Sequence, residues 1–395
     1  MSSKAMLVAV GAAALALTAS GCGGSKSSTA AGGSTSGSSS STTSGTVKVG
    51  LSGALSGSVA FLGQDSQHGA QLAISELEKQ NPKIKYSLAT ADDQCSPAGG
   101  ASAYRKLIDV DNVDVVLGSP CSGSTLGGMP VLKSSQVPGI TFGATNPTIS
   151  QQSGVGGNTY SWRMNIDDSI MGEAWSKFIA DHGVKKVALL VANNDFGRGA
   201  AEIYQKTLPA NGVKVASTEY YTYGGNDFRP ALTKIANEKP GAIVALPEPP
   251  ECALILKQMK ELGLKLPIYS RGGCATDEAL KALGSQRSLA NGVLEGSYWV
   301  GTPQQSQFIK AFQQRFHQYP PYNAALAYYG MMTIAKAVAA GGVSRSGIES
   351  GLAKVNYASP IGPIKFDAHH QAHPDMFILT VRNGKIVVLK TIKTS

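Results

Sequence analysis

Short apolar runs alternate with amphipathic stretches along most of the chain from residue 47 onward. The run Val113–Leu117 is almost entirely apolar, which is typical of a strand buried on both faces of a sheet. The stretch Gly99–Val110 instead places Ala103, Leu107 and Val110 on one face of a helix. By the same criteria, strands are expected at 47–51, 86–90, 139–142, 186–191, 213–221, 242–246, 267–270 and 293–299, and helices at 69–79, 170–182, 199–208, 228–237, 252–262, 276–283, 307–319, 324–340 and 346–355.

Strands that are separated by helices of this length form right-handed βαβ units with parallel strands. Two such series of similar length follow one another, so the pattern predicts an α/β fold of two doubly wound lobes. The C-terminal end differs, because Asn383-Gly384 separates two β-branched runs at 376–382 and 385–391. This arrangement predicts a β-hairpin.

The first residues have the pattern of an export signal followed by a lipid anchor. A short basic stretch at 1–4 precedes an apolar, uncharged stretch at 5–19, and Ala19-Ser20-Gly21-Cys22 resembles a lipobox. We therefore expect a signal peptide at 1–21 and a lipid-modified Cys22; ordinary signal cleavage near Ala19 is the alternative. The residues from there to 46 are mostly Gly, Ser and Thr, which predicts a flexible linker with an r.m.s. span of about 27 Å.

The chain has five cysteines. If Cys22 carries lipid, four remain, and an even number in an exported chain suggests two disulfides. The sequence allows three pairings. Pairing of neighbours, Cys95 with Cys121 and Cys252 with Cys274, closes loops of similar size and would stabilise the fold by about 3–4 kcal/mol for each bridge. Four buried free thiols are the alternative, and no C-x-x-C spacing suggests a redox or zinc motif.

Composition excludes several classes of protein. Hydrophobic residues make up 42% of the 395 residues, which is enough for sizeable cores, whereas charged residues make up only 15%. The formal charge of +9 is spread along the chain without a Lys/Arg-rich run, so we expect no nucleic-acid-binding surface. After residue 21 the chain has no run of about 18 apolar residues, so we expect no membrane-spanning helix there.

The sequence motifs of several enzyme classes are absent: the chain has no G-x-S-x-G, P-loop, G-x-G-x-x-G or H-E-x-x-H. The cluster His369, His370 and His373 suggests a metal site, but it lies in a polar connection without helical spacing, so we expect a solvated loop. Asp92 and Asp93 form a carboxylate pair, but neighbours on a strand point to opposite faces. We therefore expect a binding function, with no catalytic residue, metal or cofactor.

Several stretches lie in a characteristic order along the chain: Val47-Lys48-Val49-Gly50 with Ser56-Gly57 and Gly63, then 92–95 with 118–122, 138–145, 194–197, and Phe366-Asp367 with the Asn383-Gly384 hairpin. In this order they resemble the type I periplasmic binding proteins of ABC transporters, and within these the branched-chain amino-acid (leucine/isoleucine/valine) binding group. The resemblance covers about residues 47–392. It implies two Rossmann-like lobes, 47–164 plus 297–363 and 165–296 plus 364–395, joined by a three-strand hinge.

The resemblance also implies which residues of the first lobe contact a ligand. Ser122 and Thr145 each follow a predicted strand, where free N–H groups and a hydroxyl suit a carboxylate. Ordinary helix capping is the alternative for both. The carbonyl of Gly143 matches a position that helps bind an ammonium group, with Ala144 in the same loop, and Leu62 stands where the family has an aromatic contact.

In the second lobe, Phe196 stands where amino-acid binders often have Tyr, and core packing is its alternative. The family places a Glu that binds the ligand's ammonium at the position of Gly272, which follows Arg271 here. Arg271 would favour a second carboxylate. Glu248 could replace the missing acid or form a salt bridge with Arg271. A disulfide from Cys252 to Cys274 would fix these two loops to one another.

The resemblance implies a monomeric, lipid-anchored solute-binding protein that faces the periplasm or the cell exterior and delivers its ligand to the permease subunits of an ABC importer. The expected ligand is a branched-chain or other neutral amino acid. An amide, a urea-like compound or a small carboxylate is the alternative, as is a ligand sensor without transport. We expect hinge closure rather than catalysis.

Overall fold

The computed structural model describes residues 44–394 of the chain. The predicted signal peptide, the lipid-modified Cys22 and the linker up to residue 43 lie outside the described residues. The first strand begins at Gly45, two residues before its predicted start. Within 44–394, no helix combines the length and the apolar character that crossing a bilayer requires.

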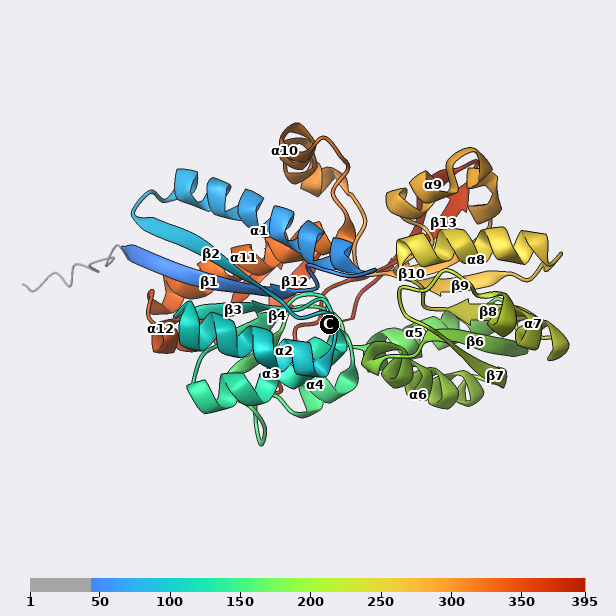
Figure 1. Cartoon of the computed structure of the whole chain (residues 1–395), viewed down its shortest axis with the longest axis horizontal. Coiled ribbons are helices and arrows are strands. Elements are labelled where there is room, and N and C mark those ends of the chain that lie inside the picture. The colour runs from blue at the N-terminus through green and yellow to red at the C-terminus, as the bar shows by residue number, and fades with distance from the viewer. Residues whose placement is uncertain (1–43, 395) are drawn as a thin grey trace, which may run out of the picture. The chain divides into compact units, whose positions relative to one another are not determined.

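The described chain forms two large sheets, and we call each sheet with its helices a lobe (Figure 1). The first lobe contains β1 (Gly45–Gly53), β2 (Ile84–Asp92), β3 (Val115–Gly118), β4 (Gly139–Thr141), β5 (Ser161–Arg163), α1 (Ala60–Gln80), α2 (Pro97–Arg105), α3 (Ser122–Ser135), α4 (Pro147–Gln151), α10 (Ser306–Phe316), α11 (Tyr322–Gly341) and α12 (Arg345–Leu352). The second lobe contains β6 (Lys186–Ala192), β7 (Lys214–Tyr221), β8 (Ala242–Ala245), β9 (Ile268–Arg271), β10 (Leu294–Ser297), β13 (Met376–Arg382), β14 (Lys385–Ile392), α5 (Asp168–Asp181), α6 (Asp195–Ala210), α7 (Arg229–Asn237), α8 (Pro249–Glu261) and α9 (Asp277–Leu283). A separate hairpin pairs β11 (Asn356–Ser359) with β12 (Gly362–Lys365).

Both sheets repeat one strand order. The first sheet runs β2-β1-β3-β4-β5, and the parallel part of the second runs β7-β6-β8-β9-β10, which is the same 2-1-3-4-5 order. In this topology the chain reverses its direction of winding next to the first strand of each lobe, and ligands bind beyond the carboxyl ends of the strands at that point. The prediction of two doubly wound lobes is confirmed.

Helices cover both faces of the first sheet. Along β3, Val115 and Leu117 join the core cluster that contains α11, whereas Val116 between them joins the cluster formed with α2 and α3. Figure 1 shows α1 and α11 on one side of the strands and α2 and α3 on the other. Successive side chains of a strand point to opposite faces, so an apolar run of this kind is buried on both sides.

The same alternation holds in the second lobe. Val187, Leu189 and Val191 of β6 face one cluster, and Ala188 and Leu190 face the other. The hairpin predicted at Asn383-Gly384 is confirmed, since β13 and β14 pair in antiparallel register and Arg382 lies opposite Lys385. Both turn residues have positive φ, 52° and 68°, as a two-residue hairpin turn requires.

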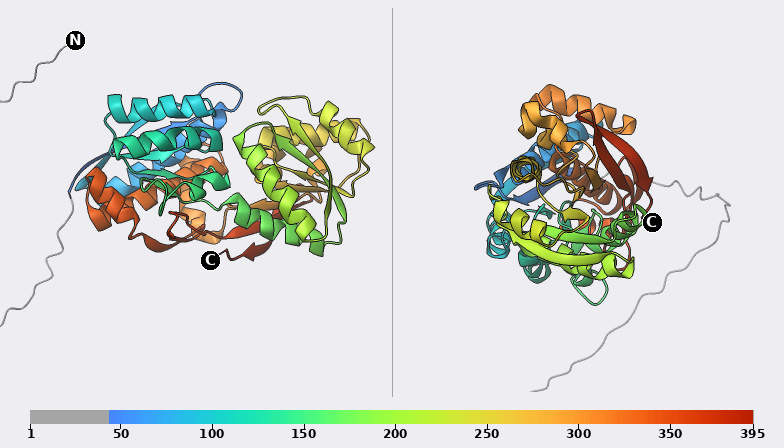
Figure 2. Two further views of the ribbon diagram at one scale, coloured as in Figure 1. Left: turned by 90° about the horizontal axis from the view of Figure 1, so that it is seen from below. Right: turned by 90° about the vertical axis from the view of Figure 1, so that its right-hand side faces the viewer.

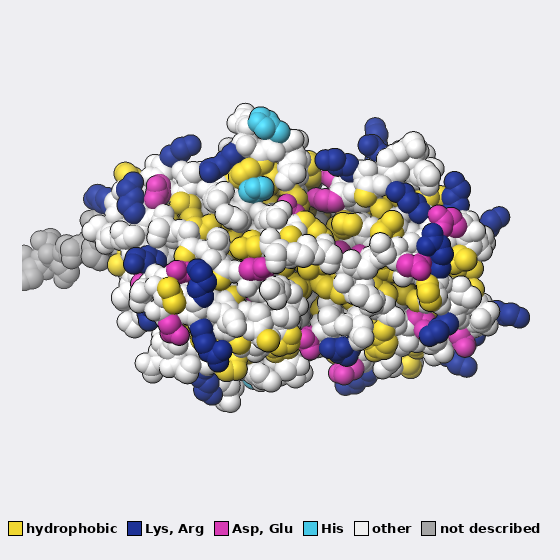
Figure 3. Space-filling model, in the orientation of Figure 1, with side chains coloured by type: hydrophobic (Ala, Val, Ile, Leu, Met, Phe, Trp, Pro, Cys, Tyr) yellow, Lys and Arg dark blue, Asp and Glu magenta, His cyan; other side chains and the backbone are white. Residues whose placement is uncertain are grey.

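The chain passes between the two sheets three times within the described residues: after β5, after β10 and after β12 (Figure 2). Two of these passages run side by side, because Arg163 forms a parallel bridge with Gln371. On the face drawn in Figure 3, Lys and Arg side chains are scattered among acidic and uncharged ones.

Some local predictions were wrong. Helix α1 begins at Ala60, well before the predicted start at residue 69. The 14-residue α3 was not predicted at all. Val110, expected on a buried helical face, is 70% exposed, because the chain widens into a π-helical turn at Lys106–Val110 and rotates that position outward.

Candidate functional site

A small cavity lies between the loops that follow the strands of both sheets. Its volume is about 40 Å³, which is space for a few water-sized groups. Its lining comprises Cys95, Pro120, Cys121, Ser122, Gly123, Gly143, Thr145, Asn194, Asp195, Phe196, Tyr223, Glu248, Arg271, Tyr298 and Tyr322. Of the eight predicted ligand residues, six line it, and Leu62 and Ala144 do not.

The N-terminus of α3 faces this cavity. Cys121 is the cap residue, and Ser122 and Gly123 open the first turn, whose N–H groups have no partner within the helix. The Ser122 hydroxyl accepts a 3.3 Å hydrogen bond from the backbone N–H of Asn146. Its own proton therefore remains available to donate, and together with the helix N-terminus this arrangement suits a carboxylate.

The loop after β4 contributes Gly143 and Thr145. The Gly143 carbonyl accepts a 3.3 Å hydrogen bond from the side chain of Asn165, which leaves one of its lone pairs free. The Thr145 hydroxyl accepts a 2.7 Å hydrogen bond from the Arg271 guanidinium. Neither Thr145 nor Ser122 is a helix cap, since Asn146 caps α4 and Cys121 precedes α3, so the capping alternative is wrong for both.

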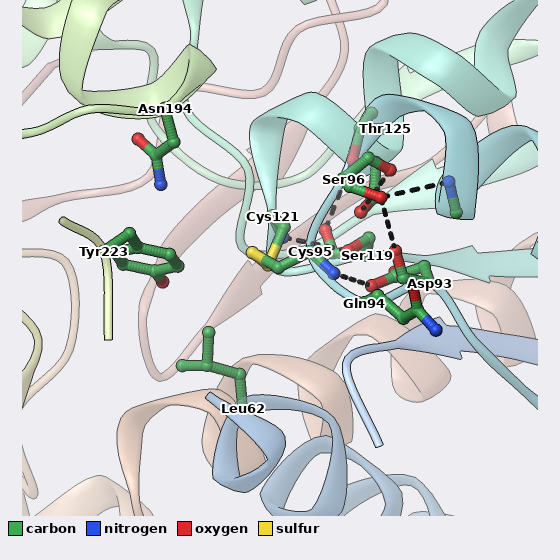
Figure 4. The surroundings of a disulfide bond; sticks show 12 residues. Leu62, Asp93, Gln94, Cys95, Ser96, Ser119, Cys121, Thr125, Asn194 and Tyr223 are labelled. Atoms are coloured by element: carbon green, nitrogen blue, oxygen red, sulfur yellow. Dashed lines mark hydrogen bonds between the residues drawn. A yellow bond between two sulfur atoms is a disulfide. The ribbon is translucent and has the colours of Figure 1, made fainter. Parts of the chain in front are cut away.

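The two remaining predicted residues of the first lobe lie behind the cavity wall. Ala144 is buried against Met129 and Ile149. Leu62 packs in a cluster with Cys121, and Figure 4 shows Leu62 and Tyr223 on the same side of the disulfide. Leu62 therefore packs behind Cys121, which lines the cavity. Its position in the sequence did not show whether Leu62 lines the cavity or supports a residue that does.

A disulfide joins Cys95 to Cys121, which confirms the predicted pairing of neighbours. Both cysteines form part of the cavity wall. The loop that presents Cys95 is shaped by the two acidic residues before it, of which Figure 4 shows Asp93. Asp93 accepts hydrogen bonds from the Cys95 N–H at 2.9 Å and from the Ser52 hydroxyl at 2.8 Å, and Asp92 accepts from the Gln94 N–H at 3.0 Å. The two carboxylates thus hold the loop.

The second lobe contributes an aromatic ring and a cation. Phe196 lies in the first turn of α6, which Asn194 caps through a 2.8 Å hydrogen bond from the Gly197 N–H. The guanidinium carbon of Arg271 lies 4.6 Å from the centre of the Phe196 ring, a cation–π contact. Phe196 is thus at the cavity, where it packs against Arg271.

Arg271 is paired with an acid that the sequence analysis missed. Its guanidinium forms an ion pair with Asp168 at the start of α5, and both side chains are almost fully buried. Burial raises the pKa of Asp168 to about 6, although the adjacent Arg271 acts to lower it. The only sequence signal was the acidic pair Asp167-Asp168 at the start of a helix. Such a pair is equally typical of ordinary helix capping, so it did not indicate a partner for Arg271.

Glu248 does not form the alternative salt bridge with Arg271. Its two carboxylate oxygens accept hydrogen bonds from the Tyr223 hydroxyl at 2.9 Å and from the Tyr322 hydroxyl at 2.6 Å. Burial raises the pKa of Glu248, while the two hydroxyls act to lower it. Among residues 44–394, Glu248 has no ion-pair partner, so its carboxylate retains capacity for a cationic group.

The second disulfide, Cys252–Cys274, is also confirmed as a pairing of neighbours. It joins α8, which begins directly after Glu248, to the loop after Arg271. Buried Glu295 braces the same loop by accepting hydrogen bonds from the N–H groups of Cys274 and Ala275, the latter at 2.8 Å. Glu248 and Arg271 therefore stand on loops that are cross-linked.

The histidine cluster lies away from the cavity. His370 stacks on Trp162 with ring centres 3.4 Å apart, and His373 bonds to Asp367 at 3.0 Å. Residues 44–394 contain no group of three or more His, Cys, Asp or Glu side chains placed to hold a metal ion.

A larger cavity of about 590 Å³ lies beside α9 and the β13–β14 hairpin, and Tyr322 at the start of α11 in the first lobe also lines it. It is not the candidate site, because the strand ends of the first lobe do not contribute to it.

Comparison with known proteins agrees with this geometry. A family model described as periplasmic binding protein matches residues 46–385. The chain belongs to this family. A Pseudomonas aeruginosa amino acid binding protein is 30% identical over 253 residues, which is 63% of this chain and just under two thirds, 66%, of that protein. A leucine-, isoleucine-, valine-, threonine- and alanine-binding protein from the same organism is 27% identical over 82% of this chain and 86% of its own length.

Solved structures of the family share the fold. The substrate-binding protein LivJ of a branched-chain amino acid transporter from Streptococcus pneumoniae, in complex with isoleucine, matches with a TM-score of 0.78 and 25% identity over 88% of this chain and all of that one. A solute-binding protein of an ABC transporter from Rhodopseudomonas palustris, in complex with benzoate, matches with a TM-score of 0.80 and 22% identity over 88% of this chain and 96% of that one. The type I fold predicted from the sequence is confirmed.

Proposed function

We propose that this protein is the extracytoplasmic, lipid-anchored solute-binding component of an ABC importer and captures a neutral α-amino acid by closing its two lobes on it. The family membership and the names of the relatives support the transport role. The pattern Met1 to Cys22 supports export and lipid anchoring.

One observation carries the ligand class: the partly buried carboxylate of Glu248 lines the cavity with hydrogen-bond donors but no cation, whereas Arg271 already has Asp168 as its counter-ion. A buried charge needs a paired charge, and the ammonium group of an amino acid supplies one for Glu248. The ligand's carboxylate would then lie at the N-terminus of α3, with the Ser122 hydroxyl as donor.

The size of the cavity narrows the class further. Its volume of about 40 Å³ compares with the roughly 10–15 Å³ that one water requires by this measure. That volume favours a small solute over a large one. A second candidate is a small carboxylate without an amine, because Arg271 lines the cavity and a structure of similar fold is in complex with benzoate.

The test compares ligands that differ only in the amino group: alanine with propanoate, and leucine with 4-methylpentanoate. A ligand present at about 1,000 times its Kd should stabilise the purified protein by about 4 kcal/mol, which thermal unfolding detects. We expect a shift with the amino acids and little or none with the amine-free acids. Equal shifts within each pair would refute the role of an ammonium group.

A variant test locates that ammonium group. Glu248→Gln should weaken amino-acid binding by about 1.5–3 kcal/mol, measured by calorimetry, because it removes the charge opposite the ammonium. Glu261→Gln is the matched control, since Glu261 is an exposed carboxylate that pairs with Arg229 at the far end of α8. If both variants bind as the unmodified protein does, the cation partner lies elsewhere.

A further inference from the structure

Arg271 is the only Lys or Arg among the described residues that line the cavity. Its side chain is 3% exposed, and it makes three contacts: with Asp168, with the Thr145 hydroxyl at 2.7 Å and with the Phe196 ring. A buried guanidinium at a ligand site normally binds a carboxylate, and it does so through paired hydrogen bonds. The counter-ion of Arg271 therefore decides whether the residue is available to a ligand.

That counter-ion, Asp168, is not part of the cavity lining. It is the first residue of α5, and its backbone N–H donates a 3.0 Å hydrogen bond to the carbonyl of Thr145, which fixes its position. The acid next to it, Asp167, is already engaged with Arg163 at 2.6 Å. Asp168 is thus the ion-pair partner of Arg271, and it lies outside the cavity lining.

The pair sets the charge of the cavity. With Asp168 ionised, the Arg271 side of the wall is neutral as a whole, and Glu248 is left as the acid without a counter-ion. Without the Asp168 charge, Arg271 would become a buried cation that lacks a partner and would attract an anion from the ligand. It would also repel an ammonium group at Glu248.

We propose that Asp168 is a specificity-determining positioning residue: by neutralising Arg271 it makes the site selective for amino acids against carboxylates that lack an amine. The proposal rests on the proposed function. It assigns a role in ligand selection to a residue that the ligand does not touch. Selectivity is the difference between two binding free energies. It can therefore be set by the absence of an unpaired cation that an amine-free carboxylate would need.

The experiment measures Kd by calorimetry for two matched pairs, alanine with propanoate and leucine with 4-methylpentanoate. The readout is the ratio of the Kd of the amine-free acid to that of the amino acid. Asp168→Asn keeps the shape of the side chain and removes its charge. We expect the amino acid to bind at least about tenfold more weakly and the amine-free acid at least about tenfold more tightly, since hydrogen bonds to charged groups are worth that much.

Two further variants separate charge from structure. The double variant Asp168→Asn with Arg271→Met removes both charges, and we expect it to recover amino-acid binding and selectivity relative to Asp168→Asn alone. Asp181→Asn lies at the exposed end of the same helix and should leave the ratio unchanged. If Asp168→Asn does not fold but the double variant folds and prefers the amino acid, the coupling of the two charges is equally demonstrated.

Two results would overturn the proposal. A ratio in Asp168→Asn within about threefold of the original, with both ligands weakened alike, would mean that Asp168 acts only on the structure of the site. A double variant that binds no better than Asp168→Asn would mean the same. Failure of the proposed function looks different, because the unmodified protein would then bind the amine-free acids as tightly as the amino acids, or bind none of the four ligands.

Discussion

Gly224 and Ser58 belong to different lobes and touch each other: a β-carbon built on Gly224 would overlap the Ser58 hydroxyl oxygen and lie 3.0 Å from the Ser58 β-carbon. A second contact between the lobes is the 2.7 Å hydrogen bond that the side-chain amide of Asn146 donates to the carbonyl of Asp195. The Tyr322–Glu248 hydrogen bond is a third. The two lobes are thus in contact around the cavity, as a closed binding protein would be.

Gly224→Ala should therefore hinder closure and weaken ligand binding about tenfold, which corresponds to about 1.4 kcal/mol. Gly263→Ala is the matched control. The two glycines have similar positive φ values, 70° and 68°, but a β-carbon on Gly263 would meet no atom within 4 Å. Both variants should lose about 1–2 kcal/mol of folding stability from the backbone conformation, and only Gly224→Ala should lose affinity in calorimetry. Equal affinities would show that this contact is not needed for closure.

Binding of an amino acid should release protons. Burial raises the pKa of Glu248 above the usual value for a Glu carboxyl, about 4.3, and an ammonium group beside it would lower the pKa again. The affinity should therefore increase as the pH rises from about 4 through the raised pKa, and decrease as the pH falls. Calorimetry in two buffers with different heats of ionisation measures the released protons.

Glu248→Gln supplies the control for this proton release, because an amide does not titrate in this range. The difference in proton release between the original protein and this variant reports Glu248 together with nearby Glu251, because burial and the adjacent Glu248 charge raise the pKa of Glu251 to about 7. Identical proton release in the two proteins would place the linked ionisation on another group.

Removal of the Cys252–Cys274 disulfide should affect both stability and binding. The bridge spans 22 residues, so Cys252→Ala with Cys274→Ala should cost about 3 kcal/mol of the free energy of unfolding, measured by denaturant titration. It should also weaken ligand binding, since the loops that carry Glu248 and Arg271 would no longer be held to one another. A loss of stability with unchanged affinity would limit the disulfide to a role in folding.

The fold could be predicted from the sequence because the inner strands of the parallel sheets, such as β3, β6 and β8, are buried on both faces. Runs such as Val187–Val191 have few polar residues, and they are separated by helices of the length that a parallel crossover needs. Helix α3 escaped prediction because Ser122–Ser135 is rich in Gly and Ser and contains Pro130, so its hydrophobic period is weak. The glycines of α3 allow α2 to pack closely against it. Gly127, for example, lies directly against the backbone of Pro97 in α2.

The site was only partly predictable, for a physical reason. Residues that follow a strand, such as Ser122 and Glu248, are placed at the cavity by topology, which the sequence pattern carries. Asp168, Tyr223 and Tyr322 matter through contacts with residues far away in the chain, and such contacts leave no local signal. The salt bridge considered between Glu248 and Arg271 is absent because Arg271 pairs with Asp168, while Glu248 accepts hydrogen bonds from two tyrosine hydroxyls.

Both disulfides border the cavity, one in its wall and one tying the loops that carry its charged residues. In the exported protein that we propose, the binding site is therefore completed by oxidation, after the chain has left a reducing compartment. Protein produced in a reducing cytoplasm would be a poor starting material for ligand screening, even where it is well expressed. Ligand binding by a freshly made sample would, in turn, report how much of it has formed both disulfides correctly.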